Sequence, residues 1–129
     1  MKALNFEDSV YKANAIRKVL NQCGVAKIEL VSNVEDGLQM LKNAEDAGAP
    51  FDLIITDMHY PMKQGAVSDT EAGEKLVQLL QEQGKQTKVI VCSSRNMKLP
   101  GVYGCIWYSE ISDWEEELCD LVREMEKNR

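Results

Sequence analysis

The fold that this sequence predicts is decided by residues 51–57, Phe51-Asp-Leu-Ile-Ile-Thr-Asp57. The middle of this stretch is a short, continuous apolar run, which is typical of a strand buried on both faces of a parallel sheet. Asp57 stands where that strand ends. Functional sites of open parallel sheets lie outside the carboxyl ends of the strands. The stretch therefore predicts a functional carboxylate at residue 57.

Strand and helix patterns alternate on both sides of this stretch. We expect strands at residues 3–6, 28–31, 51–56, 88–92 and 105–108. We expect helices at residues 9–23, after Asn33, from Ala72 to near Gly84, and from Ser112 to near Lys127. Asn33 with Asp36, and Ser112 with Glu115, have the spacing of helix N-terminal caps. The alternation predicts an α/β fold in which helices cover both faces of one doubly wound, five-stranded parallel sheet.

Two connections depart from a regular alternation. Residues 95–104 contain Pro100, Gly101 and Gly104, and they are too few and too interrupted for an ordinary crossover helix. We therefore expect a shortened or irregular fourth crossover, with at most one helical turn. Residues 59–70 predict a long polar connection after the central strand.

A second acidic group, Glu7-Asp8, directly follows the first predicted strand. If both strands are central in the sheet, Glu7, Asp8 and Asp57 converge at one edge and predict a divalent-metal site, because Mg²⁺ prefers oxygen ligands. Each group also has a simpler interpretation. The first pair could only begin a helix, where acids are favoured by the helix dipole, and Asp57 could only cap a turn.

Composition limits the class of protein. A length of 129 residues predicts one domain, and a net charge of −6 argues against a nucleic-acid partner. No apolar run reaches the roughly 20 residues that span a bilayer, and the first residues lack a signal-peptide pattern. The four cysteines have no CxxC spacing and are accompanied by one histidine, which disfavours structural zinc. We expect buried, reduced thiols in a cytoplasmic protein at Cys23, Cys92, Cys105 and Cys119.

Three segments together resemble the receiver domain of two-component response regulators. They are Phe-Glu-Asp at residues 6–8, DLIITDMHYPM at residues 52–62 and VIVCSS at residues 89–94. The resemblance covers nearly the whole chain and implies a single receiver-like domain at residues 1–129, with a flavodoxin-like fold and strand order 2-1-3-4-5. It also implies that Asp57 accepts a phosphoryl group, and that Ser93 contacts this group and takes part in a switch. Mg²⁺ would be held by Glu7, directly or through water, by Asp8 and Asp57, and by the backbone carbonyl of His59.

One part of the receiver pattern is missing. Receivers carry a lysine at the end of the last strand, where this chain has Tyr108-Ser109-Glu110, and no lysine occurs from residue 101 to 120. A positive charge near the phosphate is then absent, unless Arg95 or Lys98 folds back toward it. The unusual fourth crossover also alters the surface that receivers use for output.

The resemblance implies a stand-alone, atypical receiver rather than an enzyme, limited to its own phosphorylation and dephosphorylation. Its partners would be a histidine kinase or phosphotransfer protein and an unknown downstream protein, with no second domain in this chain. The alternative is a pseudo-receiver that binds partners without phosphate. A small metal-dependent phosphatase is a third hypothesis. It is disfavoured because His59 stands where the second acid of a DxD arrangement would lie.

Overall fold

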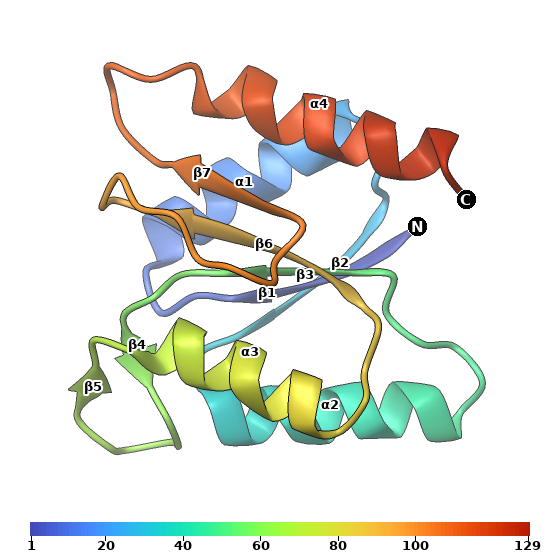
Figure 1. The fold of residues 1–129 in the computed structure, drawn as a ribbon, viewed down its shortest axis with the longest axis vertical. Coiled ribbons are helices and arrows are strands. Elements are labelled where there is room, and N and C mark those ends of the chain that lie inside the picture. The colour runs from blue at the N-terminus through green and yellow to red at the C-terminus, as the bar shows by residue number, and fades with distance from the viewer.

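A computed structural model describes all 129 residues and contains one five-stranded parallel sheet. The order of its strands is β2 (Lys27–Val31), β1 (Lys2–Phe6), β3 (Leu53–Thr56), β6 (Lys88–Ser93) and β7 (Gly104–Trp107). Strands β6 and β7 are the fourth and fifth predicted strands, so the predicted order 2-1-3-4-5 is confirmed. The predicted flavodoxin-like α/β architecture is confirmed with it (Figure 1).

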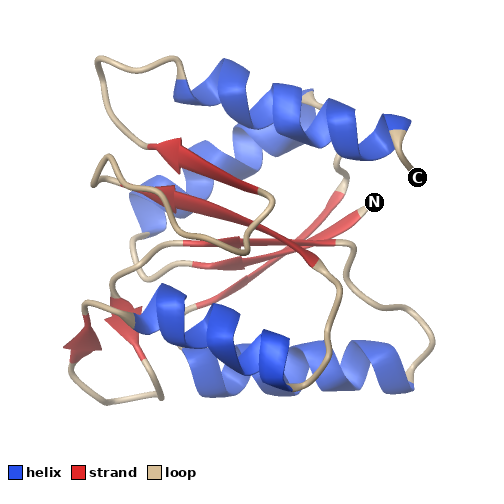
Figure 2. Cartoon of the chain, viewed as in Figure 1, coloured by secondary structure: helices blue, strands red, loops and turns tan.

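Four helices cover the sheet, two on each face (Figures 1 and 2). They are α1 (Val10–Gln22) and α4 (Trp114–Lys127) on one face, and α2 (Val34–Asp46) and α3 (Ala72–Glu82) on the other. The core is correspondingly divided into two apolar clusters, one under each pair of helices. The central strand β3 is buried along its whole length, as expected for a strand covered on both faces. None of the four helices has the length and apolar character needed to cross a bilayer.

The fourth crossover contains no helix, as predicted. Residues 94–103 connect β6 and β7 as an irregular segment with bends at both ends and one turn at Pro100 and Gly101. Leu99 and Val102 from this segment pack against the cluster under α2 and α3. Two apolar side chains of an irregular segment therefore cover part of the sheet face.

The connection after Asp57 has more structure than the polar pattern predicted. It forms a small antiparallel hairpin of β4 (Tyr60–Pro61) and β5 (Ser68–Asp69). Tyr60 is fully buried, and its hydroxyl lies 2.7 Å from the hydroxyl of Thr56. The hairpin thus folds back against the end of β3.

Two further predictions were wrong. Cys23 and Cys119 are joined by a disulfide between the end of α1 and the middle of α4. Cys92 is a buried free thiol as expected, and Cys105 is a free thiol that is only partly buried. Ser112 does not cap the last helix. Its hydroxyl donates to the carbonyl oxygens of Trp107 and Ser109 instead, and the helix begins one residue later than a Ser112 cap requires. The cap predicted at Asn33 is confirmed, because its side chain accepts from the Asp36 amide at 2.8 Å.

Candidate functional site

The three predicted metal ligands come together at the carboxyl edge of the sheet. Strands β1 and β3 pair in parallel with Phe6 beside Thr56, so the residues that follow them are also neighbours. Candidate ligand atoms of Glu7, Asp8 and Asp57 all lie within 4.8 Å of one another. The convergence follows directly from the strand order, because β1 and β3 are adjacent.

Glu7 is the buried member of the group. Its side chain is 2% exposed, and one oxygen, Oε2, accepts from the Ser9 amide at 3.1 Å. The other oxygen, Oε1, is buried without a hydrogen-bond partner, although the Lys12 ammonium lies 3.2 Å away as an ion pair. Burial raises the pKa of the Glu7 carboxyl, Lys12 offsets part of this rise, and the nearby Asp57 charge adds to it.

The carboxylate of Asp57 is oriented by the backbone of the next residue and by Lys12. Its Oδ1 accepts from the Met58 amide at 2.7 Å, whereas Oδ2 lies 3.2 Å from the Lys12 ammonium. The Asp57 amide donates to the Phe6 carbonyl at 3.1 Å, so the strand ladder continues to the edge of the site. The side chain is 16% exposed and therefore points to the accessible edge rather than into the apolar core.

The remaining predicted residues lie in the same cleft, which Glu7, Asp8, Asp57, His59 and Ser93 line together with residues of the hairpin and of the 94–103 loop. Asp8 and His59 are exposed. Ser93 is buried at the end of β6, and its hydroxyl oxygen accepts from the Arg95 amide at 3.1 Å. That hydroxyl donates to no group of the protein, so its proton is available to a ligand in the cleft.

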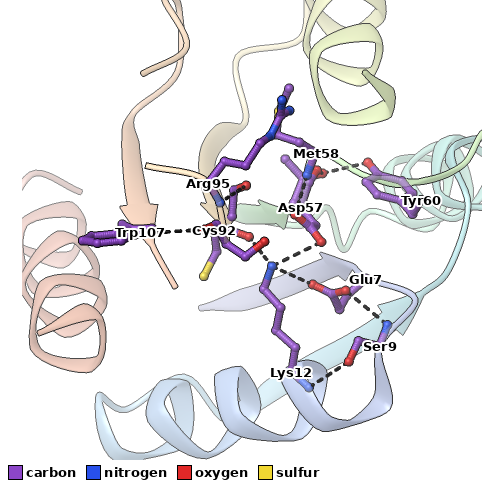
Figure 3. Close-up of polar contacts among 12 residues, drawn as sticks. Glu7, Ser9, Lys12, Asp57, Met58, Tyr60, Cys92, Arg95 and Trp107 are labelled. Carbon is purple, nitrogen blue, oxygen red and sulfur yellow. Dashed lines mark hydrogen bonds and ion pairs between the residues drawn. The ribbon is translucent and has the colours of Figure 1, made fainter. Parts of the chain in front are cut away.

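Lys12 is the charged residue of this cleft that the sequence predictions missed. Its ammonium donates to the Cys92 carbonyl at 2.6 Å and lies between the carboxylates of Glu7 and Asp57 (Figure 3). Burial lowers the pKa of Lys12, but the attraction of Asp57 and Glu7 outweighs that effect and raises the pKa overall. A signal was present in the sequence, because Lys12 lies on the helical stripe of Ile16 and Val19, which faces the core.

The alternatives considered for the missing charge do not provide it. The Arg95 guanidinium lies 3.5 Å from the Thr70 carbonyl, and it forms no ion pair with the carboxylates. Lys98 is exposed on the 94–103 loop and forms no ion pair. Tyr108, at the position of the expected lysine, packs its ring against Trp114 with centroids 4.8 Å apart.

Comparison with solved structures agrees with the fold described above. The receiver domain of the Francisella response regulator 1452 superposes with a TM-score of 0.72 at 16% identity, over 99% of this chain and 98% of that one. The signal receiver domain of an HD domain-containing protein from Pseudomonas fluorescens Pf-5 gives 0.72 at 16% identity, over 98% and 94%. The chemotaxis response regulator CheY4 of Vibrio cholerae gives 0.66 at 20% identity, over 96% and 97%.

This chain has the receiver-domain fold. The predicted resemblance is confirmed at the level of fold over nearly the whole length. Neither a protein-family model nor the sequence of a curated protein matches the chain. Similarity to solved receiver domains is therefore carried by the fold.

The acidic cluster of this receiver fold fits a hard divalent cation. Three carboxylates offer oxygens within 4.8 Å of one another, and Glu7 Oε1 is a buried oxygen with no partner except the Lys12 ammonium. A buried carboxylate needs compensating charge, and this one ammonium is shared between Glu7 and Asp57. Mg²⁺ takes one or two carboxylates and keeps several waters, which suits a site that is buried at Glu7 and open to solvent at Asp8.

Proposed function

We propose that this chain is a phospho-accepting receiver domain of a two-component or phosphorelay signalling system, with Asp57 as the acceptor. The observation that carries the proposal is the position of Asp57. One of its oxygens is fixed by the Met58 amide, and the carboxylate faces a cleft that also contains the acidic cluster and Ser93. This arrangement supports the binding and orientation of a phosphoryl group at Asp57.

Phosphorylation would join an Asp57 carboxylate oxygen to the phosphorus atom of a phosphohistidine donor. The phosphorus–nitrogen bond of the donor breaks, and its electron pair leaves with the imidazole nitrogen. Mg²⁺, held by Glu7, Asp8, Asp57 and the His59 carbonyl, would neutralise charge on the phosphoryl oxygens. Ser93 would donate its free hydroxyl proton to one of these oxygens.

The donor would be a histidine kinase or a phosphotransfer protein. Readout would occur by binding a downstream protein, since receiver chemistry ends with the acyl phosphate and its hydrolysis. The 1–129 segment would act as a single receiver-like unit in the cytoplasm.

A specific observation favours a second candidate, a pseudo-receiver that signals without phosphate. The Lys12 ammonium already pairs with Asp57 at 3.2 Å. A cation already compensates the charge of this carboxylate, so its burial does not require a phosphoryl group. In this candidate the protein would bind its partners in a single, unphosphorylated state.

Binding of beryllofluoride, a phosphate mimic, separates the two candidates. With Mg²⁺ present, amide NMR signals near Asp57 and Ser93 should shift in the receiver, and a small acyl-phosphate donor should add one phosphoryl group by mass. Asp57→Asn should abolish both responses, whereas Asp46→Asn, at the exposed end of α2, should leave them intact. A wild-type protein that responds to neither beryllofluoride nor the acyl-phosphate donor would identify the pseudo-receiver. Continuous turnover of phosphate monoesters would identify a phosphatase.

A further inference from the structure

Lys12 is a buried cation that contacts the end of each of the three central strands. Its side chain is 8% exposed. The ammonium has three donors, and three acceptors surround it: Glu7 Oε1 after β1, Asp57 Oδ2 after β3, and the Cys92 carbonyl in β6 (Figure 3). A lysine is rarely buried unless its charge is compensated, and here two carboxylates compensate it.

The helix start fixes where this cation lies. The Ser9 hydroxyl caps α1 by accepting from the Lys12 amide at 3.3 Å, and the Ser9 amide donates to Glu7. The backbone of Lys12 is therefore bound to the same short segment that carries the acidic cluster. On the other side, the Tyr108 ring lies 5.2 Å from the ammonium, within the range of a cation–π contact.

No other cation of the protein reaches Asp57. Of the eight ion pairs in the structure, the only one that involves Asp57 is the pair with Lys12. Addition of a phosphoryl group changes the charge on this side chain from −1 to about −2 near neutral pH and moves it outward onto the phosphoryl oxygens. The N–H that now faces Asp57 Oδ2 is the nearest charged donor to that new charge.

We propose that Lys12 is a catalytic residue that donates this N–H to a phosphoryl oxygen on Asp57, so that helix α1 supplies the positive charge that the end of β7 lacks. The inference rests on the proposed phosphorylation of Asp57. Lys12 transfers no proton in this step: the ammonium stays charged and exchanges a carboxylate oxygen for a phosphoryl oxygen as its acceptor. The Tyr108 ring lies against the ammonium and keeps it directed at the carboxylates.

The first test compares Lys12→Met with wild type in two separate titrations. Beryllofluoride affinity, measured by NMR with saturating Mg²⁺, should fall by about tenfold or more, the usual effect of losing a charge-assisted hydrogen bond. Mg²⁺ affinity, measured by calorimetry without beryllofluoride, should stay equal or rise, because a cation that competes for Glu7 and Asp57 has been removed. Lys18→Met, exposed on the same helix, is the matched control and should change neither affinity.

The second test introduces a lysine at residue 108, on the other side of the cleft from Lys12. In the double variant Lys12→Met/Tyr108→Lys the ammonium approaches Asp57 from the end of β7. Beryllofluoride affinity should recover most of its loss. This double variant also keeps the inference testable if Lys12→Met alone fails to fold. We expect it to fold, because the new lysine again compensates the buried charge of Glu7.

Three results would overturn the inference. If folded Lys12→Met binds beryllofluoride as tightly as wild type, Lys12 does not contact the phosphoryl group, and the proposed function stands without it. If the variant loses Mg²⁺ and beryllofluoride affinity together, or the double variant shows no recovery, the role of Lys12 is to shape the carboxylates. If wild type itself binds no beryllofluoride, the proposed function fails and this inference fails with it.

Discussion

Gly73 shows how closely the backbone packs beneath the acceptor. A Cβ added at this position would lie 2.4 Å from the Asp57 carbonyl oxygen and 2.9 Å from the Met58 sulfur. The Gly73 amide donates to the Met58 carbonyl at 3.2 Å. The first turn of α3 therefore rests directly on the segment that orients Asp57, and only glycine leaves room for that contact.

Gly73→Ala should destabilise the protein by about 1–2 kcal/mol. An unobstructed helical Gly→Ala change gains up to about 1 kcal/mol, but overpacking against backbone atoms costs about 1–3 kcal/mol and outweighs that gain. Urea unfolding measures the difference. Gln78→Ala, exposed on the same helix, should be nearly neutral, and a more stable Gly73→Ala protein would show that the contact at Asp57 is loose.

Among the individual residues of the site, the acids were predicted from the sequence but the cation between them was not. Glu7, Asp8 and Asp57 each follow a predicted strand, so the strand order alone brings them together. Lys12 lies in a helix, where a lysine usually faces water. Its burial becomes favourable only when Glu7 and Asp57 meet, and that is a property of the folded sheet.

At the scale of elements, apolar periodicity predicted the five parallel strands and the four helices, because those elements bury continuous runs or stripes. The β4–β5 hairpin was missed. Its strands have two residues each and include Pro61, which is too short for an alternating pattern. The Ser112 cap was wrong because the hydroxyl found two nearby carbonyl acceptors, a competition that spacing cannot show.

The hairpin is tied to α3 by an ion pair that makes it sensitive to acid. The Lys75 ammonium lies 2.5 Å from Asp69 Oδ2, and Oδ1 of Asp69 accepts from the Glu71 amide. The hydrogen bond from Lys75, followed by that from Glu71, lowers the pKa of Asp69 below its reference value of 3.8. The contact therefore stabilises the folded hairpin above pH 3.8 and is lost as the pH falls through the lower, folded pKa.

Lys75→Gln should raise the pKa of Asp69 toward its ordinary value. The carboxyl carbon of Asp69, followed by NMR from pH 2 to 6, should titrate at higher pH in the variant, and amide exchange in the hairpin should be faster. Lys42→Gln, exposed on α2, provides the control. An unchanged Asp69 titration would mean that the ion pair is not maintained in solution.

At the scale of the molecule, the disulfide joins parts of the chain that are far apart in sequence. Cys23 ends α1, Cys119 lies in α4, and 96 positions separate them. The two helices pack side by side over one face of the sheet (Figure 1). Sequence spacing could not identify this pair, because four cysteines without a short motif allow several pairings.

Removal of this bridge should lower the free energy of unfolding by about 2–5 kcal/mol, since a long closed loop restricts the unfolded chain. Urea unfolding of Cys23→Ala/Cys119→Ala should match wild type in reductant, with both less stable than oxidised wild type. Cys105→Ala should keep the response to reductant. A wild-type protein that is indifferent to reductant would show that the two thiols are not bonded in solution.

Helix α1 is attached at both ends to different parts of the molecule. Its first turn carries the Lys12 ammonium, and its last residues lead to the bridge with α4. We expect a tilt of α1 that begins at the ammonium to be transmitted through the bridge to α4. Such coupling would connect the cleft with the surface of the C-terminal helix without the irregular 94–103 segment.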